Sequence, residues 1–308
     1  MIYTLTLNPA IDRELAVPRL EFDEVLRATA VREDYGGKGF NVSRLLTAWG
    51  VENVALGFVG GYAGQKIEAG LKGLGIRTEF VKIAGETRTN ISIVSEPQRR
   101  HIKVNEPGPA ILPAELDALE RRVRKLTRAG DWWVLSGSLP PGVPSTFYAT
   151  LTGELKAAGA RVVLDASGAA LRAGCAAGPF LAKPNAIEAA ELTGIQRVRL
   201  QAADVATAIH RLGVQHALIT LGKEGALFSD RQRLLFIETP PVVEVNPIGA
   251  GDSTVAALVW SAAQGLDWEE SLRWSIACGA VAAGLAGTAV PEQSRVQALM
   301  ATVRITPL

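Results

Sequence analysis

The chain has 308 residues, of which 48% are hydrophobic and 20% are charged, and its formal net charge at pH 7 is +1. This length and apolar content suffice for one large α/β domain, or for a core with a smaller appendage. A nearly neutral chain without charge blocks offers no electrostatic argument for binding nucleic acid or an anionic membrane.

Two further features concern the compartment. Cys175 and Cys278 lie among Ala and Gly, which predicts small buried side chains in a reducing compartment, and neither a disulfide nor a metal pair. The first residues have no basic lead and no cleavage site, so we expect no signal peptide and a cytoplasmic protein. The uncharged stretch 274–291 is rich in Ala and Gly, which indicates a helix buried in the core rather than a membrane span.

Along the chain, short apolar strands alternate with helices. Strands are predicted at 2–7, 54–59, 77–83, 131–135, 161–164 and 216–220. Helices are predicted at 40–49, 61–74, 113–126, 144–158 and 201–212, followed by a β-rich region to Val245 and two terminal helices. This alternation is typical of βαβ units and a mostly parallel sheet.

Two more polar segments interrupt that alternation. Extended stretches fall at 11–17 and 26–35, and a hairpin of 89–94 and 100–104 surrounds Pro97. Polar strands of this kind are expected of a small antiparallel sheet with one solvated face. We therefore expect one domain spanning 1–308, with a β-sheet lid formed by insertions near 11–35 and 87–106.

Small and polar residues gather where strands are predicted to end. They occupy 8–12, 36–41, 136–138, 165–167, 183–188, 220–225 and 249–252. Ligands of a doubly wound sheet bind beyond the carboxyl ends of its strands, so these positions together predict a site, although each alone is explained by a turn.

The turn at Gly249, Ala250 and Gly251 precedes an apolar helix that begins near Asp252. Unpaired amides and the positive end of the helix dipole make such a turn suitable for a phosphate. Asp252 would repel that phosphate unless it has a chemical task, and the task it fits is accepting a proton from an attacking hydroxyl. The alternative is that Asp252 merely caps the helix.

A second glycine turn comprises Gly36-Gly37-Lys38-Gly39 and is followed by Asn41. We favour a role in holding an anionic or polyhydroxyl ligand over a plain strand-to-helix turn. On the predicted lid, Arg88, Asn90 and Lys103 could close over a phosphorylated substrate. The alternative is a solvated face, which explains most isolated Arg residues.

Lys183, Asn185 and Glu188 follow another predicted strand end. Asn185 and Glu188 could hold the water shell of Mg²⁺, which takes few direct protein ligands. A helix capped by Asn, with Glu in its first turn, has the same pattern, so the sequence leaves both interpretations open.

Several motifs are missing. There is no Gly-x-x-x-x-Gly-Lys-Ser/Thr, which excludes a P-loop NTPase, and no Gly-x-Gly-x-x-Gly after the first strand, which weakens a dinucleotide-dependent oxidoreductase. His101, His210 and His216 lie away from every glycine turn, which argues against a Ser-His-Asp relay or a histidine metal site.

The ordered series of motifs resembles the ribokinase-like sugar kinases, in particular the phosphofructokinase-B branch, over essentially the whole chain. Its markers are the motifs at 6–12, 36–44, 87–90, 136–142, 183–188 and 249–253. The resemblance implies a ribokinase-like three-layer core, ATP-dependent phosphorylation of a sugar phosphate with Mg²⁺, and a homodimer formed through the lid.

The same resemblance implies roles for matching positions. Asp252 would be the base, and the backbone of 249–251 would be the anion hole. The sugar phosphate would be held by Asp12, Gly37, Asn41, Arg88 and Ser138. The nucleotide and Mg²⁺ would be held by Lys183, Asn185, Glu188, Thr220, Gly222 and Gly225.

Within the branch, the Gly-Gly-Lys-Gly turn and the following helix look most like 1-phosphofructokinases, which convert fructose 1-phosphate to fructose 1,6-bisphosphate. Tagatose-6-phosphate kinases and 6-phosphofructokinases are the alternatives. Pro247 and Ala257 depart from the usual Thr and Gly, and Pro247 bears on nucleotide binding. A sensor that binds a sugar phosphate or nucleotide without catalysis is the rival from another class.

Overall fold

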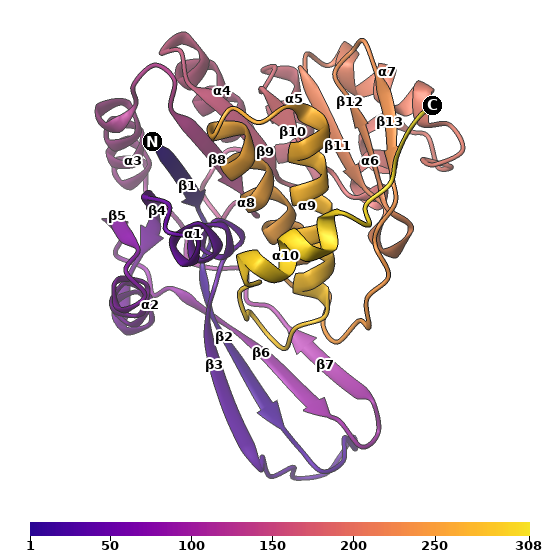
Figure 1. The fold of residues 1–308 in the computed structure, drawn as a ribbon. Helices are drawn as coiled ribbons and strands as arrows, with labels where there is room; N and C mark the ends of the chain where they lie inside the picture. The colour runs from indigo at the N-terminus through magenta and orange to yellow at the C-terminus, as the bar shows by residue number, and fades with distance from the viewer.

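A ten-stranded sheet runs through the core of the computed structural model, which describes residues 1–308 (Figure 1). Its strand order is β14-β13-β12-β11-β10-β9-β8-β1-β4-β5. The bounds are β1 Ile2–Thr6, β4 Asn53–Val59, β5 Arg77–Lys82, β8 Trp132–Ser136, β9 Arg161–Asp165, β10 Leu181–Ala182, β11 His216–Thr220, β12 Ala226–Ser229, β13 Leu234–Ile237 and β14 Ile305–Pro307. The seven neighbouring strands β5, β4, β1, β8, β9, β10 and β11 pair in parallel, whereas β12, β13 and β14 extend the sheet with antiparallel pairs. The expectation of a mostly parallel sheet is confirmed.

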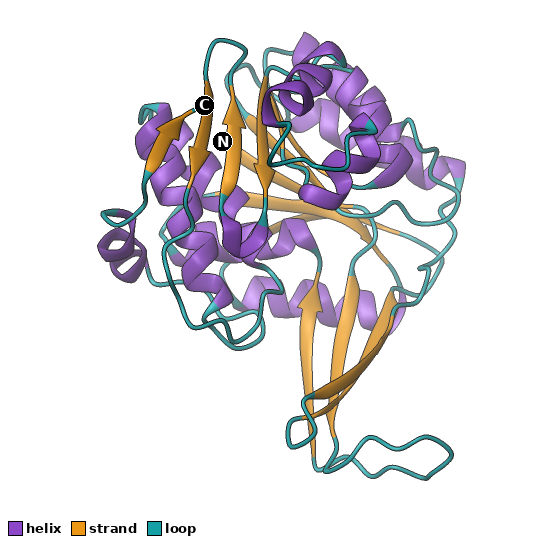
Figure 2. Ribbon diagram, turned by 90° about the vertical axis from the view of Figure 1, so that its right-hand side faces the viewer, coloured by secondary structure: helices purple, strands orange, loops and turns teal.

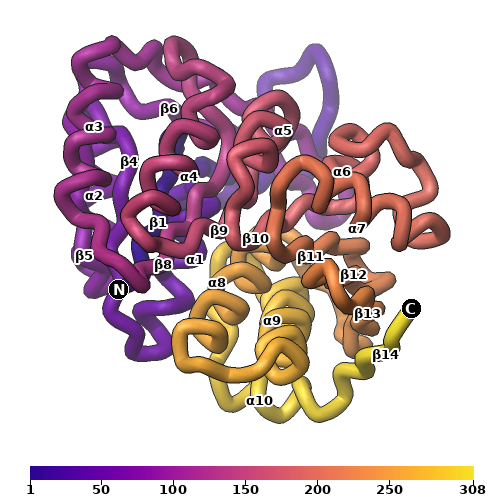
Figure 3. The backbone as a smooth tube through the Cα atoms, turned by 90° about the horizontal axis from the view of Figure 1, so that it is seen from above, coloured from indigo at the N-terminus to yellow at the C-terminus, as the bar shows by residue number.

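Helices cover both faces of this sheet (Figure 3). On one face lie α1 Lys38–Ala48, α2 Gly61–Gly73, α8 Ala250–Ala263, α9 Trp268–Ala283 and α10 Gln293–Met300. On the other lie α3 Pro113–Leu126, α4 Phe147–Ala157, α5 Gly168–Ala176, α6 Ala186–Thr193 and α7 Ala202–Arg211. Successive side chains of a strand point to opposite faces, so Leu56 of β4 packs in the core under α3–α7 and Ala55 under α2. The three-layer α/β architecture is confirmed.

A separate four-stranded sheet projects away from the core (Figure 2). Its order is β3-β2-β6-β7, with β2 at Ala10–Ala16, β3 at Ala30–Gly36, β6 at Arg88–Ser95 and β7 at Arg100–Val104. The outer pairs are antiparallel, and the central pair of β2 and β6 is parallel because both strands leave the core in the same direction. The small sheet is where the sequence predicted it, although β3 begins at Ala30 and not at Leu26.

The C-terminal third differs from the expected order. The predicted β-rich region ends at Ile237, and 238–249 has no strand, since Pro240, Pro241 and Pro247 lack the amide that a ladder requires. Three helices follow instead of two, and a short strand, β14, closes the chain.

The apolar helix predicted at 274–291 begins at Trp268 and ends at Ala283. It starts earlier because Asp267 caps it, accepting a hydrogen bond from the backbone N–H of Glu270 at 2.9 Å. Cys278 in this helix and Cys175 in α5 are both buried and free, as expected. None of the helices combines the length and the apolar character needed to cross a bilayer.

Candidate active site

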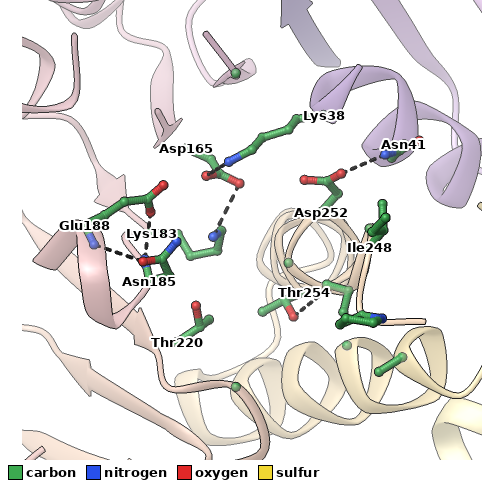
Figure 4. Close-up of a pocket in the computed structure, with 18 of the residues that line it drawn as sticks. Lys38, Asn41, Asp165, Lys183, Asn185, Glu188, Thr220, Ile248, Asp252 and Thr254 are labelled. Carbon is green, nitrogen blue, oxygen red and sulfur yellow. Dashed lines mark hydrogen bonds and ion pairs between the residues drawn. The ribbon is translucent and has the colours of Figure 1, made fainter. Parts of the chain in front are cut away.

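A cavity of about 960 Å³ lies at the carboxyl ends of the parallel strands, between the lid, α1, α6 and α8 (Figure 4). All predicted site residues except Asn90 line it. They are Asp12, Gly37, Lys38, Asn41, Arg88, Lys103, Ser138, Lys183, Asn185, Glu188, Thr220, Gly222, Gly225, Gly249, Ala250, Gly251 and Asp252.

Asp252 lies in the first turn of α8, and its side chain is not a helix cap. Gly249 is the N-cap residue, in the left-handed conformation that glycine adopts readily, with φ 83°. No side chain caps this helix, and Oδ2 of Asp252 instead accepts a hydrogen bond from Nδ2 of Asn41 at 2.8 Å. The capping alternative is therefore wrong for this structure, and the carboxylate faces the cavity (Figure 4).

The surroundings of Asp252 raise its pKa to about 6. Burial is the main cause, and the negative charge of Asp165 adds to it. The hydrogen bond from Asn41 and the positive charges of Lys38 and Lys183 act in the opposite direction. A carboxylate with a pKa near neutrality is suited to accept a proton in a reaction at physiological pH.

The backbone turn before α8 offers unpaired amides. The N–H groups of Gly249 and Gly251 have no acceptor in the protein, whereas the N–H of Ala250 donates to the carbonyl of Pro247 at 3.2 Å. Only two of the three amides of 249–251 are thus free to bind an anion, because the third already donates a hydrogen bond within the protein. The Lys183 ammonium lies close to this turn, 3.6 Å from where a Cβ on Gly251 would be.

Asp165, at the end of β9, joins two cations. Its Oδ1 lies 2.8 Å from Nζ of Lys38 and its Oδ2 lies 3.4 Å from Nζ of Lys183. Burial alone would raise the pKa of Asp165, but the charges of Lys183 and Lys38 outweigh it, so the pKa lies below its usual value. The pKa of Lys38 is raised because Asp165 outweighs the effect of burial. Sequence reasoning placed Asp165 at a strand end without giving it a role.

On the lid side, Asn90 supports Asp12. Its Nδ2 donates to Oδ1 of Asp12 at 2.8 Å, and its buried side chain does not line the cavity. Nη1 of Arg88 donates to the carbonyl of Glu106 and Nη2 to that of Asn8, while its Nε is buried without a partner. Arg88 is therefore anchored at the base of the lid, and Nε is the donor left unpaired.

At the opposite end of the cavity, Asn185 and Glu188 form a reciprocal cap on α6. Oδ1 of Asn185 accepts from the N–H of Glu188 at 2.9 Å, and Oε2 of Glu188 accepts from the N–H of Asn185 at 2.8 Å. The capping interpretation is confirmed, and Oε1 of Glu188 has no hydrogen-bond partner. A single free carboxylate oxygen beside a cavity fits a hydrated Mg²⁺, which keeps most of its waters.

Sequence reasoning missed a set of apolar residues that line the cavity, called the apolar wall below. It is formed by Pro240 and Val242 in the loop after β13 and by Ile276, Ala280 and Ala283 of α9. The Ala- and Gly-rich composition of α9 indicated only a core helix, so the sequence carried no signal that one side of it borders the cavity.

Comparison with known proteins gives a consistent result. Residues 3–295 match the family described as pfkB family carbohydrate kinase. The chain is 41% identical to a 1-phosphofructokinase of Xanthomonas campestris pv. campestris, over 83% of this chain and 82% of that protein. It is 35% identical to a tagatose-6-phosphate kinase of Staphylococcus epidermidis, over 84% of each chain. Its fold matches the phosphofructokinase-2 of Escherichia coli in complex with potassium with a TM-score of 0.91, at 31% identity over 98% of each chain.

Proposed function

The chain belongs to the pfkB family of carbohydrate kinases and acts as an ATP-dependent ketohexose-phosphate kinase, and we propose that its substrate is fructose 1-phosphate, which it converts to fructose 1,6-bisphosphate. The identity to a 1-phosphofructokinase and the Gly-Gly-Lys-Gly turn that opens α1 support this choice of substrate. Tagatose 6-phosphate and fructose 6-phosphate are the alternative acceptors.

One observation carries the proposal for the chemistry. The carboxylate of Asp252 and the turn with the unpaired amides of Gly249 and Gly251 line one cavity, which is also lined by residues of the lid and by the apolar wall. A base and a set of anion-binding donors are thus placed where two substrates could meet, which is the arrangement that transfer of a phosphoryl group requires.

The mechanism follows from this arrangement. Asp252 accepts the proton of the primary hydroxyl as that oxygen bonds to the γ-phosphorus of ATP, and the bond from this phosphorus to the bridging oxygen of ADP breaks. The amides of Gly249 and Gly251 and the ammonium of Lys183 stabilise the negative charge on the transferring group. Oε1 of Glu188 and the Asn185 side chain would hold a hydrated Mg²⁺, which would supply positive charge against the phosphates.

The other residues divide between two ends of the cavity. We assign Asp12, Gly37, Lys38, Asn41, Arg88, Lys103 and Ser138 to the sugar phosphate, with Asn90 holding Asp12 in place. Thr220, Gly222 and Gly225 border the nucleotide, and the wall formed by Pro240, Val242 and α9 suits the flat face of a base. Closure of the lid would exclude water and limit hydrolysis of ATP.

We also propose that two copies of the chain pair through their lids in the cytoplasm. The lid exposes large apolar side chains, including Phe22 at 70%, Val25 at 83%, Val31 at 54% and Val104 at 59% of their accessible surface. Several exposed large apolar side chains on one small sheet are typical of a protein–protein interface.

The test of function is an ADP-release assay with fructose 1-phosphate, fructose 6-phosphate, tagatose 6-phosphate and unphosphorylated sugars. We expect the highest kcat/KM with fructose 1-phosphate. A higher value with another ketohexose phosphate would reassign the substrate. Binding of sugar phosphate without any ADP release would support the non-catalytic sensor instead.

A further inference from the structure

Arg44 is a buried cation that the proposed mechanism does not use. It lies on α1, three residues after Asn41, and only 8% of it is exposed. Its Nη1 donates to Oδ1 of Asn41 at 3.2 Å, and its Nη2 donates to the backbone carbonyl of Tyr35 at 2.8 Å. The guanidinium also lies 5.9 Å from the centre of the Tyr35 ring.

Asn41 connects this arginine to Asp252. A side-chain amide has an oxygen that only accepts hydrogen bonds and a nitrogen that only donates them. The nitrogen of Asn41 donates to Oδ2 of Asp252 at 2.8 Å, so its oxygen points toward Arg44. If the amide turned over, its oxygen would face the carboxylate and its NH₂ would face the guanidinium, and both contacts would be repulsive.

The charged groups that surround Asp252 differ from those that surround Arg44. Asp252 faces Asp165, Lys38 and Lys183 from β9, α1 and the residue after β10. Arg44 faces Asp34 and Asp12 of the lid strands and Tyr35. Burial lowers the pKa of Arg44 and these neighbours raise it, and an arginine remains charged in either case.

Tyr35 belongs to β3, which leads from the lid into the glycine turn before α1. Its backbone pairs with Ile11 of β2, and its ring packs against Gly70 of α2. The carbonyl that Arg44 contacts is therefore fixed to the base of the lid rather than to the core sheet.

We propose that Arg44 is a positioning residue that orients the Asn41 amide toward Asp252 and ties that orientation to the base of the lid at Tyr35. This rests on the proposed role of Asp252 as the base. The contact from Asn41 holds the carboxylate in one rotamer and favours its ionised form, so loss of Arg44 should both misplace the base and make it harder to ionise.

The experiment compares pH profiles of kcat for Arg44→Met, Arg44→Lys and the control Arg121→Met, which removes an exposed arginine of α3. We expect Arg44→Met to lower kcat by about tenfold, with the KM for ATP little changed. The acid limb of the pH profile should move to higher pH by about one unit. Arg44→Lys should shift the limb in the same direction, since the shorter lysine lacks the planar fork with which the guanidinium reaches both Oδ1 of Asn41 and the carbonyl of Tyr35. Arg121→Met should match the parent enzyme.

A double-mutant cycle separates this role from packing. If Arg44 acts through Asn41, adding Arg44→Met to Asn41→Ala should change kcat by less than about twofold. Additive losses would overturn the proposal, as would a folded Arg44→Met variant with the parental acid limb. If Arg44→Met does not fold, the same two readings are taken on Arg44→Lys.

A third variant tests the link to the lid. Tyr35→Ala removes the ring against the guanidinium and should shift the acid limb in the same direction by less, whereas a parental limb would overturn that part of the proposal. Near-parental turnover by Asp252→Asn would contradict the base itself. A strongly impaired Asp252→Asn together with an unchanged Arg44→Met would contradict only the role of Arg44.

Discussion

The ammonium nitrogen of Lys38 lies 2.8 Å from Oδ1 of Asp165, so a cation that we assign to the sugar phosphate is held by a carboxylate at the carboxyl end of β9. The other oxygen of the same carboxylate lies 3.4 Å from Nζ of Lys183, which we assign to the nucleotide phosphates. Asp165 thus pairs with two cations that line the same cavity.

Replacing Asp165 with Asn should therefore have two separate effects, one on the pKa of Asp252 and one on kcat and stability. Removing a negative charge near Asp252 should lower the pKa of Asp252 and move the acid limb of the pH profile to lower pH. Releasing Lys38 and Lys183 should lower kcat and cost about 1–3 kcal/mol of stability, since buried charges lose their partner. The profile and a urea titration measure both effects, and an unmoved acid limb would contradict the coupling.

Replacing Asp252 with Asn should abolish most turnover but stabilise the fold. We expect kcat to fall by about 10²–10⁴, the usual contribution of a positioned base. The folded-state pKa of about 6 lies above the ordinary value of 3.8, so the ionised carboxylate is disfavoured in the folded protein. At pH 8 the variant should be more stable than the parent by about 1–3 kcal/mol in denaturant unfolding. Near-normal turnover would exclude Asp252 from the chemistry.

The pH dependence of the parent enzyme follows from the same pKa. As pH falls through about 6, Asp252 becomes protonated and cannot accept a proton, so kcat should decrease about tenfold per pH unit below that point. The effect on stability has the opposite sign, because the contribution of this group declines as pH rises through the folded-state pKa. A kcat constant from pH 7 to pH 5 would disagree with this assignment.

Replacing Arg88 with Ala should mainly affect the sugar phosphate. Arg88 joins the carbonyls of Asn8 and Glu106 at the base of the lid, and its Nε is the donor without a partner. We expect the KM for the phosphorylated sugar to rise by about tenfold or more, with a smaller change for ATP. Arg100→Ala at the exposed tip of the lid is the matched control. An effect confined to ATP would show that the two ends of the cavity are exchanged.

Replacing Glu188 with Gln separates the two interpretations of this residue. Gln can still close the N-terminus of α6, so the melting temperature should stay within a few degrees of the parent. The negative charge is lost, so the Mg²⁺ concentration for half-maximal rate should rise several-fold. An unchanged Mg²⁺ requirement would leave Glu188 with the capping role alone.

The sequence predicted those parts of the site that glycine turns and polar strand ends encode locally. The turns before α1 and α8 and the cap at Asn185 have strong local signals, and the structure brings them to one cavity. The role of Asp165 was not predictable, because one Asp at a strand end also fits an ordinary turn and its two lysine partners come from distant segments. The parallel pairing of β2 with β6 likewise depends on where two remote strands leave the core.

The order of the terminal elements was predicted least well. A β-rich region was expected as far as Val245, but the strands end at Ile237, and the prolines that follow prevent the chain from joining a sheet. The short α10 and β14 carry too few apolar residues for a periodic pattern, so only tertiary packing reveals them.

Three strands of the lid meet the core at one level, where Ala10 pairs with both Gly36 and Arg88, whereas β7 ends at Val104, opposite Ile91 and farther from the core. Rotation of the lid at this junction would move its four paired strands together, and Asp12 and Lys103 would move with them. The loops at the far end of the lid, 17–29 and 96–99, are not paired with another strand. The chain can therefore change in length there without disturbing the residues that line the cavity. The lid is thus the part of the fold in which related enzymes can differ in size while keeping the same chemistry.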